Sequence, residues 1–435
     1  MSIIDSSPTQ ATNWKQLSYF RVFVENDAHL QNARYPLLNN KRQQLRVTVR
    51  LAAKDAAGNV ATIPKSDLDQ IRLIDYNTSA LIDYNDNFSG DWTSSWHHRG
   101  FIWDRGFLDS IRSLRLEQPQ LFETSDSSAD DADYADYADD PDAKVSEPIE
   151  QTSESFGPVL ISPSMDATLA DCPGGYQCVT FYVSTGARAA RRLAARITNG
   201  DGTVFRSNYS DVTDDLGEGD KRGRFNSSFE VEPVSFPSLP NENFGDRKAD
   251  GSGYLRDTLV TSNKFSWGEY RAFEQHVNIR MPNGRKVPIK SVTSHPGDAD
   301  GAIGGEMMWA SRGPVTRSKT TFTYISYPGE SHVRMQEPPN WFGHNGSFLK
   351  LYSLLAAAFT NFTPRIFNPR AGEVVIGHFL TDQNYQFYYR AQHGAEHQVP
   401  NKMIMPLHLM DIYGTEHRLR LGLVSTHNYL TLNKV

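Results

Sequence analysis

The stretch Glu274–Val292, EQHVNIRMPNGRKVPIKSV, decides the fold that the sequence predicts. Two runs of alternating strand-forming residues flank the turn Pro282-Asn283-Gly284. An Asn-Gly pair supplies the positive φ that a tight reversal needs, and the period-2 alternation places one face of the ribbon in a core. The stretch therefore predicts a β-hairpin.

Similar turns recur along the chain. Further hairpins are predicted at Gln44–Ile63, Arg192–Ser207 and Leu407–Val424. Short helices are predicted at Pro64–Ile71 and Phe107–Leu116, the second because its apolar residues have helical spacing. We therefore expect a mainly β fold of two or three β-sandwich domains, immunoglobulin-like or jelly-roll, with a few short helices.

The length of 435 residues is too great for one β-sandwich, since domains average roughly 100–200 residues. Shifts in composition predict an N-terminal β domain with short helices at 1–124 and an acidic disordered linker at 125–155. A central β-sandwich at 156–236, a second linker at 237–253 and a C-terminal β domain at 254–435 with one buried helix would follow.

The acidic linker centres on Ser125–Gln151, which carries eight aspartates, two glutamates and one lysine. Almost no aliphatic residues accompany them, so the segment cannot bury enough apolar area to offset its ordering entropy. A disordered spacer is the favoured interpretation. Alternatively, its Ala-Asp-Tyr repeat is a tyrosine-anchored docking segment for a basic groove, or a weak cation trap.

Charge and hydropathy limit which partners and which cellular locations we expect. The net charge of −7 gives no overall field to attract phosphate backbones, so we expect no nucleic-acid partner. The N-terminus lacks a secretory signal pattern, and no stretch reaches 18 apolar residues, so we expect no transmembrane segment and synthesis as a soluble protein. These features leave the cellular location unknown.

An aromatic loop at Gly90–Arg105 is the first candidate ligand site. Its candidate binding residues are Trp92, Trp96, His97, His98 and Trp103. A glycan platform would present aromatic faces to a sugar, but a core or a domain interface uses the same residues and is the favoured interpretation.

A predicted helix at Gly346–Phe359 is the candidate assembly interface. Apolar residues nearly surround it, so it would be buried under a sheet or between subunits. The residues that would make the interface are Phe348, Leu349, Leu351, Tyr352, Leu354, Leu355 and Phe359.

The sharpest catalytic pattern is H-x-x-E-H at His393, Glu396 and His397. Zinc hydrolases with this motif need a helix, which places both imidazoles on one face. Gly394 after the first histidine and Pro400 beyond the second oppose a helix. We therefore favour a loop over a metal site, and we expect no cofactor.

The two cysteines, Cys172 and Cys178, flank a Pro-Gly-Gly turn. Two reduced thiols are the simpler interpretation, and a disulfide is the alternative in an oxidising compartment. The histidines near the C-terminus would form a pH-responsive cluster only if they converge.

These observations predict a non-enzymatic structural or assembly protein built of β-sandwich domains. It would be a homo-oligomer or would bind other subunits, in a particle, filament or surface layer. The alternative is a secreted or delivered toxin or effector component that binds a glycan or a membrane through the aromatic loop.

Overall fold

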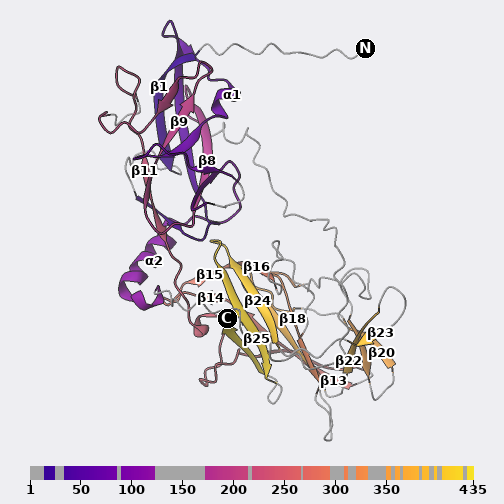
Figure 1. Cartoon of the computed structure of the whole chain (residues 1–435). Coiled ribbons are helices and arrows are strands. Elements are labelled where there is room, and N and C mark those ends of the chain that lie inside the picture. Colours follow the sequence, from indigo (N-terminus) through magenta and orange to yellow (C-terminus); the bar gives the residue numbers. More distant parts are fainter. Residues whose placement is uncertain are drawn as a thin grey trace, which may run out of the picture.

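A computed structural model shows a mainly β protein with two β-sandwiches (Figure 1). It describes residues 14–24, 34–85, 90–122, 172–213, 218–265, 268–293, 308–311, 320–331, 349–353, 358–362, 366–381, 385–390, 396–398, 404–424 and 429–435. The acidic segment 125–155 lies outside these residues. The expected fold class is confirmed.

The first sandwich packs two sheets on one apolar core. One sheet has the order β1-β3-β8-β7-β6, with β4 also pairing with β3. Its strands are β1 Trp14–Val24, β3 Leu45–Asp55, β4 Val60–Ala61, β6 Asp83–Tyr84, β7 Trp92–Ser95 and β8 Gln177–Thr185. The other sheet has the order β10-β9-β11-β2, with β5 also pairing with β9. Its strands are β2 Arg34–Leu38, β5 Arg72–Asp75, β9 Arg191–Thr198, β10 Val204–Arg206 and β11 Phe229–Val234.

Strand pairing in this sandwich joins the two ranges that the sequence separated. β3 pairs with β8 in one sheet, and β2 pairs with β11 in the other. Apolar side chains from both sheets, such as Val47, Phe181 and Phe229, share one core. The expectation of separate β domains at 1–124 and 156–236 is therefore corrected, because each range supplies strands whose partners lie in the other.

The second sandwich also packs two sheets. One has the order β12-β13-β21-β18-β17 and the other the order β16-β24-β25-β26. Their strands are β12 Thr258–Phe265, β13 Gly268–Val277, β17 Met308–Ser311, β18 Thr320–Ile325, β21 Val374–Thr381, β16 Ile289–Thr293, β24 Ile404–Asp411, β25 Glu416–Val424 and β26 Tyr429–Lys434. Val277 and Ile376 of the first sheet meet Leu407 and Leu421 of the second in one core. The C-terminal strand thus pairs inside its own sandwich.

The deciding stretch bridges the two sheets of the second sandwich. Its turn is present: Met281 N–H donates to the carbonyl of Arg285, and Gly284 has a φ of +82°. The hairpin itself is short, with β14 Ile279–Arg280 pairing with β15 Lys286–Val287. Before it, β13 belongs to one sheet, and after it β16 belongs to the other. The turn therefore moves the chain from one layer to the next.

The predicted helix at Gly346–Phe359 is wrong. Residues 349–353 and 358–362 are strands β19 Leu349–Ser353 and β20 Ala358–Phe362, which pair with each other. With β22 Tyr385–Arg390 and β23 Glu396–Gln398 they form a four-stranded sheet. Cross-strand hydrogen bonds outweigh the helix propensity of the Leu-rich and Ala-rich run, because propensity is a weak preference that tertiary context overrides.

Two predicted helices are present, as α1 Lys65–Leu68 and α2 Arg105–Glu117. The 3-10 turns η1 Pro119–Leu121 and η2 Asn241–Asn243 add short helical segments. The stretch 237–253 is not a loose linker, because Leu239 and Phe244 are buried in the core of the second sandwich. Cys172 and Cys178 form a disulfide with their Cα atoms 5.8 Å apart, so the simpler expectation of reduced thiols is corrected.

Candidate functional site at the junction of the two sandwiches

Helix α2 lies where the two sandwiches meet (Figure 1). It follows β7 of the first sandwich in the chain, yet Phe107, Leu108, Ile111 and Leu114 are buried in the core of the second. Leu38 of β2, at the edge of the first sandwich, belongs to the same core. A single apolar core therefore extends from the second sandwich across the junction.

The aromatic contact at the centre of the junction joins Phe107 to Tyr413. Their rings stack with centroids 3.9 Å apart and an angle of 9° between the planes. Tyr413 sits in the turn between β24 and β25, which reverses at Gly414 with a φ of +87°. A Cβ at Gly414 would lie 2.8 Å from the Cβ of Arg42, so this turn also approaches the first sandwich closely.

The turn of the β14–β15 hairpin (the central hairpin) reaches the same helix. Asp104 is the N-cap of α2 and accepts a hydrogen bond from the Phe107 N–H. Arg285 donates to the other carboxylate oxygen of Asp104 at 2.8 Å, and its guanidinium lies over the Phe107 ring. Burial alone would raise the pKa of Asp104, but the Phe107 and Arg285 bonds outweigh it and the pKa is lowered. The N-cap is thus held ionised beside its cation.

Backbone bonds complete the junction through the segment after the predicted aromatic loop. The Ile102 N–H donates to the carbonyl of Ile412, and the Ile412 N–H donates to the carbonyl of Pro288. Lys290 donates to the carbonyl of Gly100 at 2.8 Å and lies 4.1 Å from the centroid of the Phe101 ring. Residues 100–102 therefore hydrogen-bond to β16 and to the β24–β25 turn of the second sandwich.

Of the three tryptophans of the aromatic loop, Trp92 is buried and Trp96 and Trp103 are partly buried. Trp92 is 7% exposed and lies in the core of the first sandwich. Trp96 packs on the same core, and its ring contacts Tyr84. Trp103 packs on both cores and donates to the carbonyl of Pro36. This placement agrees with the interpretation of the loop as core and interface. The glycan platform stays a prediction, because none of these three tryptophan rings is exposed.

The two histidines of that loop are exposed. The ring of His98 lies near the Tyr182 ring, with centroids 5.0 Å apart, and its Nε2 is 3.2 Å from the carbonyl of Phe101. His97 accepts a bond at its carbonyl from Gln44. Both therefore lie at the rim of the junction, apart from the buried tryptophan rings.

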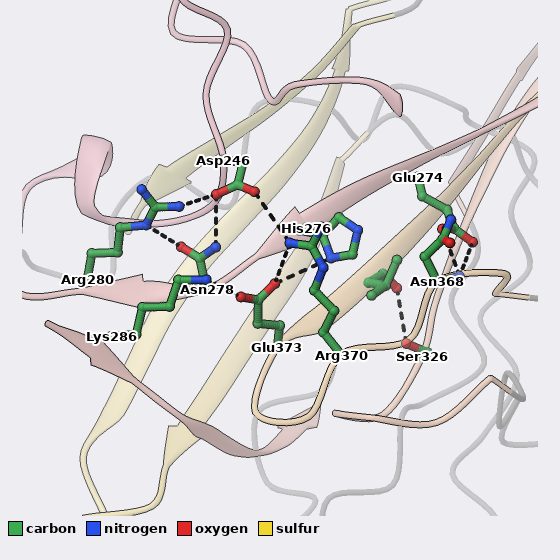
Figure 2. Close-up of polar contacts among 11 residues, drawn as sticks. Asp246, Glu274, His276, Asn278, Arg280, Lys286, Ser326, Asn368, Arg370 and Glu373 are labelled. Carbon is green, nitrogen blue, oxygen red and sulfur yellow. Dashed lines mark hydrogen bonds and ion pairs between the residues drawn. The ribbon is translucent and has the colours of Figure 1, made fainter. Parts of the chain in front are cut away.

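A charged network fastens the central hairpin to two neighbouring loops (Figure 2). Asp246 accepts bonds from Arg280 and from the Nδ2 of Asn278. Glu373 accepts from Lys286 at 2.6 Å, and Arg370 contacts both carboxylates. Asp246 and Glu373 each face a cation, so these pairs fix the hairpin to both loops.

Two further ionisable groups, His276 and Glu274, lie buried on β13, the first within this network and the second beside it (Figure 2). His276 has its Nδ1 at 3.3 Å from Glu373, and burial and the nearby Arg370 lower the pKa of His276. Glu274 is 1% exposed and accepts bonds from the backbone N–H groups of Phe367 and Asn368. The Asn368 side chain donates a further bond at 2.8 Å. This carboxylate therefore holds the loop before β21 against the sheet.

His378 on β21 is buried without a hydrogen-bond partner for either ring nitrogen in the described parts of the chain. Its neighbours across the sheet are Phe273 and Thr323. Burial lowers the pKa of His378 to about 4, so the ring is neutral at neutral pH. Sequence reasoning grouped this histidine with others by position alone and could not assign it a role.

The remaining predicted site residues lie in the sheet formed by β19, β20, β22 and β23. Glu396 and His397 are in strand β23, which pairs with β22, so this half of H-x-x-E-H is not helical. His393 lies outside the described residues. No group of three or more potential metal ligands occurs within the described ranges.

The predicted assembly residues are divided between strands and undescribed positions. Leu349, Leu351 and Tyr352 lie in β19, and Phe359 lies in β20. Phe348, Leu354 and Leu355 lie outside the described residues. The assembly interface therefore stays a prediction, now for strands in place of a helix. Among the described helices, none has the length and apolar character to cross a bilayer.

Comparison with known proteins adds little to this geometry. No protein-family model and no curated protein matches the chain. Among solved structures, the C-terminal domain of the antigen I/II-family protein AspA from Streptococcus pyogenes is similar over 93% of this chain and 99% of that chain. The identity is 7% and the TM-score 0.21. At that TM-score the likeness establishes neither family nor function.

Proposed function

We propose that the protein is a non-enzymatic structural subunit whose two sandwiches act as one stiff building block of a larger assembly. The observation that carries this proposal is the continuous apolar core through α2, with the Phe107–Tyr413 stack at its centre. Domains joined by flexible linkers reorient freely, whereas a large apolar interface fixes their orientation. A fixed orientation is what a repeating subunit of a particle, filament or surface layer needs.

Two ion pairs reinforce the junction beside the apolar stack. Asp104–Arg285 and Arg42–Glu416 are ion pairs between the two sandwiches, at 2.8 Å and 3.3 Å. Side-chain exposures of 24–39% at these four residues limit the strength of each pair, so the apolar stack supplies most of the stabilisation. The pairs instead fix the register of one sandwich on the other.

The oligomeric state tests the proposal. Light scattering on a size-exclusion column, with negative-stain microscopy of the same fractions at physiological salt, should show a discrete oligomer or filament well above 48.9 kDa. A monomer at every concentration tested would overturn the assembly proposal.

A matched pair of variants makes the role of the junction explicit. Tyr413→Ala removes the ring that stacks on Phe107, and Tyr413→Phe keeps it. If the fixed orientation matters, the alanine variant should form fewer or less regular assemblies at equal folded fraction, and the phenylalanine variant should match the wild type. Equal assembly by both variants would show that assembly does not require the stack between Tyr413 and Phe107.

A further inference from the structure

The outward face of the β1–β3–β8 sheet carries cations that lack acidic partners. Arg21 on β1 and Arg50 on β3 are directly opposite each other across the strands. Lys54 lies four residues beyond Arg50 on β3, with the same outward alternation. Within the described part of the chain, none of the three forms an ion pair with a carboxylate. Like charges opposed across a strand pair destabilise a sheet, so this pair of arginines favours a bound anion that would reduce the repulsion.

One aromatic ring, that of Phe23, lies against two of these cations. The guanidinium groups of Arg21 and Arg50 lie 5.2 Å and 4.1 Å from the centroid of the Phe23 ring. Cation–π attraction offsets part of their repulsion. The Arg50 Nε atom is nevertheless buried without a hydrogen-bond partner. A bound anion would balance the two charges and leave the ring contacts in place.

A depression of about 650 Å³ opens beside the cations. Tyr19, Lys54 and Tyr176 line it, and the Tyr19 and Tyr176 rings are in contact with centroids 4.6 Å apart. Glu218 also lines it and is the one acidic side chain among the described residues of its lining. The site thus combines positive charge with aromatic surface, which favours an acidic peptide with aromatic side chains.

The same chain carries such a peptide, which precedes strand β8 of this face in the sequence. Ser125–Gln151 alternates aspartates with Tyr134 and Tyr137. The segment leads into Cys172, whose disulfide partner Cys178 is directly opposite Arg50 on the neighbouring strand. About 20 intervening residues can extend on the order of 70 Å, and a tether of this kind gives an effective concentration of roughly millimolar.

We propose that the acidic segment Ser125–Gln151 binds the basic face formed by Arg21, Arg50 and Lys54 of its own chain. Aspartate carboxylates accept charge-assisted hydrogen bonds from the three cations, and the tyrosines occupy the aromatic depression. The proposal does not depend on self-assembly.

Zero-length carbodiimide cross-linking of the full chain, read by mass spectrometry, tests it. A mixture of isotopically labelled and unlabelled protein distinguishes links within one chain from links between copies. We expect Lys54 to be joined to aspartates of 125–151 within one chain. The link between Lys15 and Asp201, an ion pair at 2.5 Å, serves as an internal standard for the chemistry and the fold.

The double variant Arg21→Gln, Arg50→Gln keeps Lys54 and removes the opposed charges. It should reduce the Lys54 link about tenfold relative to the Lys15–Asp201 standard. An undiminished Lys54 link in the double variant would overturn the proposal. So would a Lys15–Asp201 link formed without any link from Lys54 to the acidic segment, or Lys54 links found only between different copies.

Discussion

The two sandwiches share an architecture but differ in what they bury. Counting only carboxylates and imidazoles in the described residues, the first sandwich buries two, Asp67 and Asp75. Asp67 accepts a bond from the Trp14 indole, and Asp75 pairs with Arg191. The second sandwich buries six, which are Glu274, His276, Glu373, His378, Asp411 and His417.

The difference teaches how each sandwich is stabilised. An apolar core is non-directional and tolerates relaxation, whereas buried ionisable groups need particular partners and lose stability when one is removed. The first sandwich therefore rests mainly on burial, and the second also rests on the bonds that satisfy Glu274 and Glu373. Variants at the junction and in the second sandwich should distinguish stabilisation by apolar burial from stabilisation by bonds to buried ionisable groups.

The largest expected loss of stability is at Phe107. This residue follows a strand of the first sandwich in the sequence, but its ring is buried in the core of the second. Phe107→Ala should lower the free energy of unfolding by about 3–5 kcal/mol, because it empties a fully buried ring position. Denaturant titration measures the loss. Leu116→Ala on the same helix is the control, since Leu116 is 86% exposed and should change stability by less than about 0.5 kcal/mol. Equal losses in the two variants would contradict the shared core.

The next effect is the response of the second sandwich to acid. The pKa of His378 is lowered from 6.5 to about 4 by burial. Between these values the unfolded chain binds a proton that the folded chain does not. The free energy of unfolding should therefore fall as the pH drops from 6.5 towards 4, by on the order of 3 kcal/mol in total.

Urea titrations across this pH range measure the effect. Desolvation also lowers the pKa of His98 in the first sandwich, and the pKa of His276 in the second is lowered as well, so a variant at His378 is needed to isolate the contribution of this ring. His378→Gln removes this titrating ring and should make the pH profile between 4 and 6.5 shallower, with the remaining slope due to groups such as His276. Parallel profiles for the wild type and the variant would show that burial of this imidazole is not the cause.

A smaller loss is expected at the buried carboxylate of Glu274. Glu274→Gln keeps the volume but replaces an acceptor oxygen by an amide that faces N–H donors. The free energy of unfolding should fall by about 1–3 kcal/mol. Glu117→Gln at the exposed end of α2 is the matched control, with no expected change beyond about 0.5 kcal/mol. A neutral Glu274→Gln would mean that the second sandwich rests on apolar burial as the first does.

The smallest expected effect is at the N-cap of the junction helix. Asp104→Ala removes the acceptor for the Phe107 N–H and the partner of Arg285, and should cost about 1 kcal/mol. Asp109→Ala, one turn along the same helix, removes a carboxylate without a capping role and should cost less. Thermal unfolding of the two variants decides the order, and a reversed order would contradict the capping assignment.

The sequence predicted what depends on local pattern. The turn at Pro282-Asn283-Gly284, the helix around Phe107–Leu116 and the hairpin at Leu407–Val424 follow from turn chemistry and periodicity, and the structure confirms them. It could not predict what depends on distant partners. The pairing of β3 with β8 joins residues more than a hundred positions apart, so a domain boundary drawn by composition fell between partners.

The candidate site shows the same division. The tryptophans of the aromatic loop predict a core or an interface, and Trp103 does contact both cores. The residues that meet it were not foreseen, because Tyr413 and Arg285 come from turns whose sequences signal only a reversal. At 346–359, strong helix formers lie in strands, since pairing with β22 supplies a constraint that propensity does not contain.

Hydrogen–deuterium exchange of the wild type and Phe107→Ala tests most directly whether the two sandwiches form one unit. The relevant peptides come from β3 and β8 in the first sandwich and from β24 and β25 in the second. The shared core predicts that protection falls in both sets by a similar factor when the Phe107 ring is removed. Loss of protection confined to α2 and the second sandwich, with β3 and β8 unchanged, would contradict it.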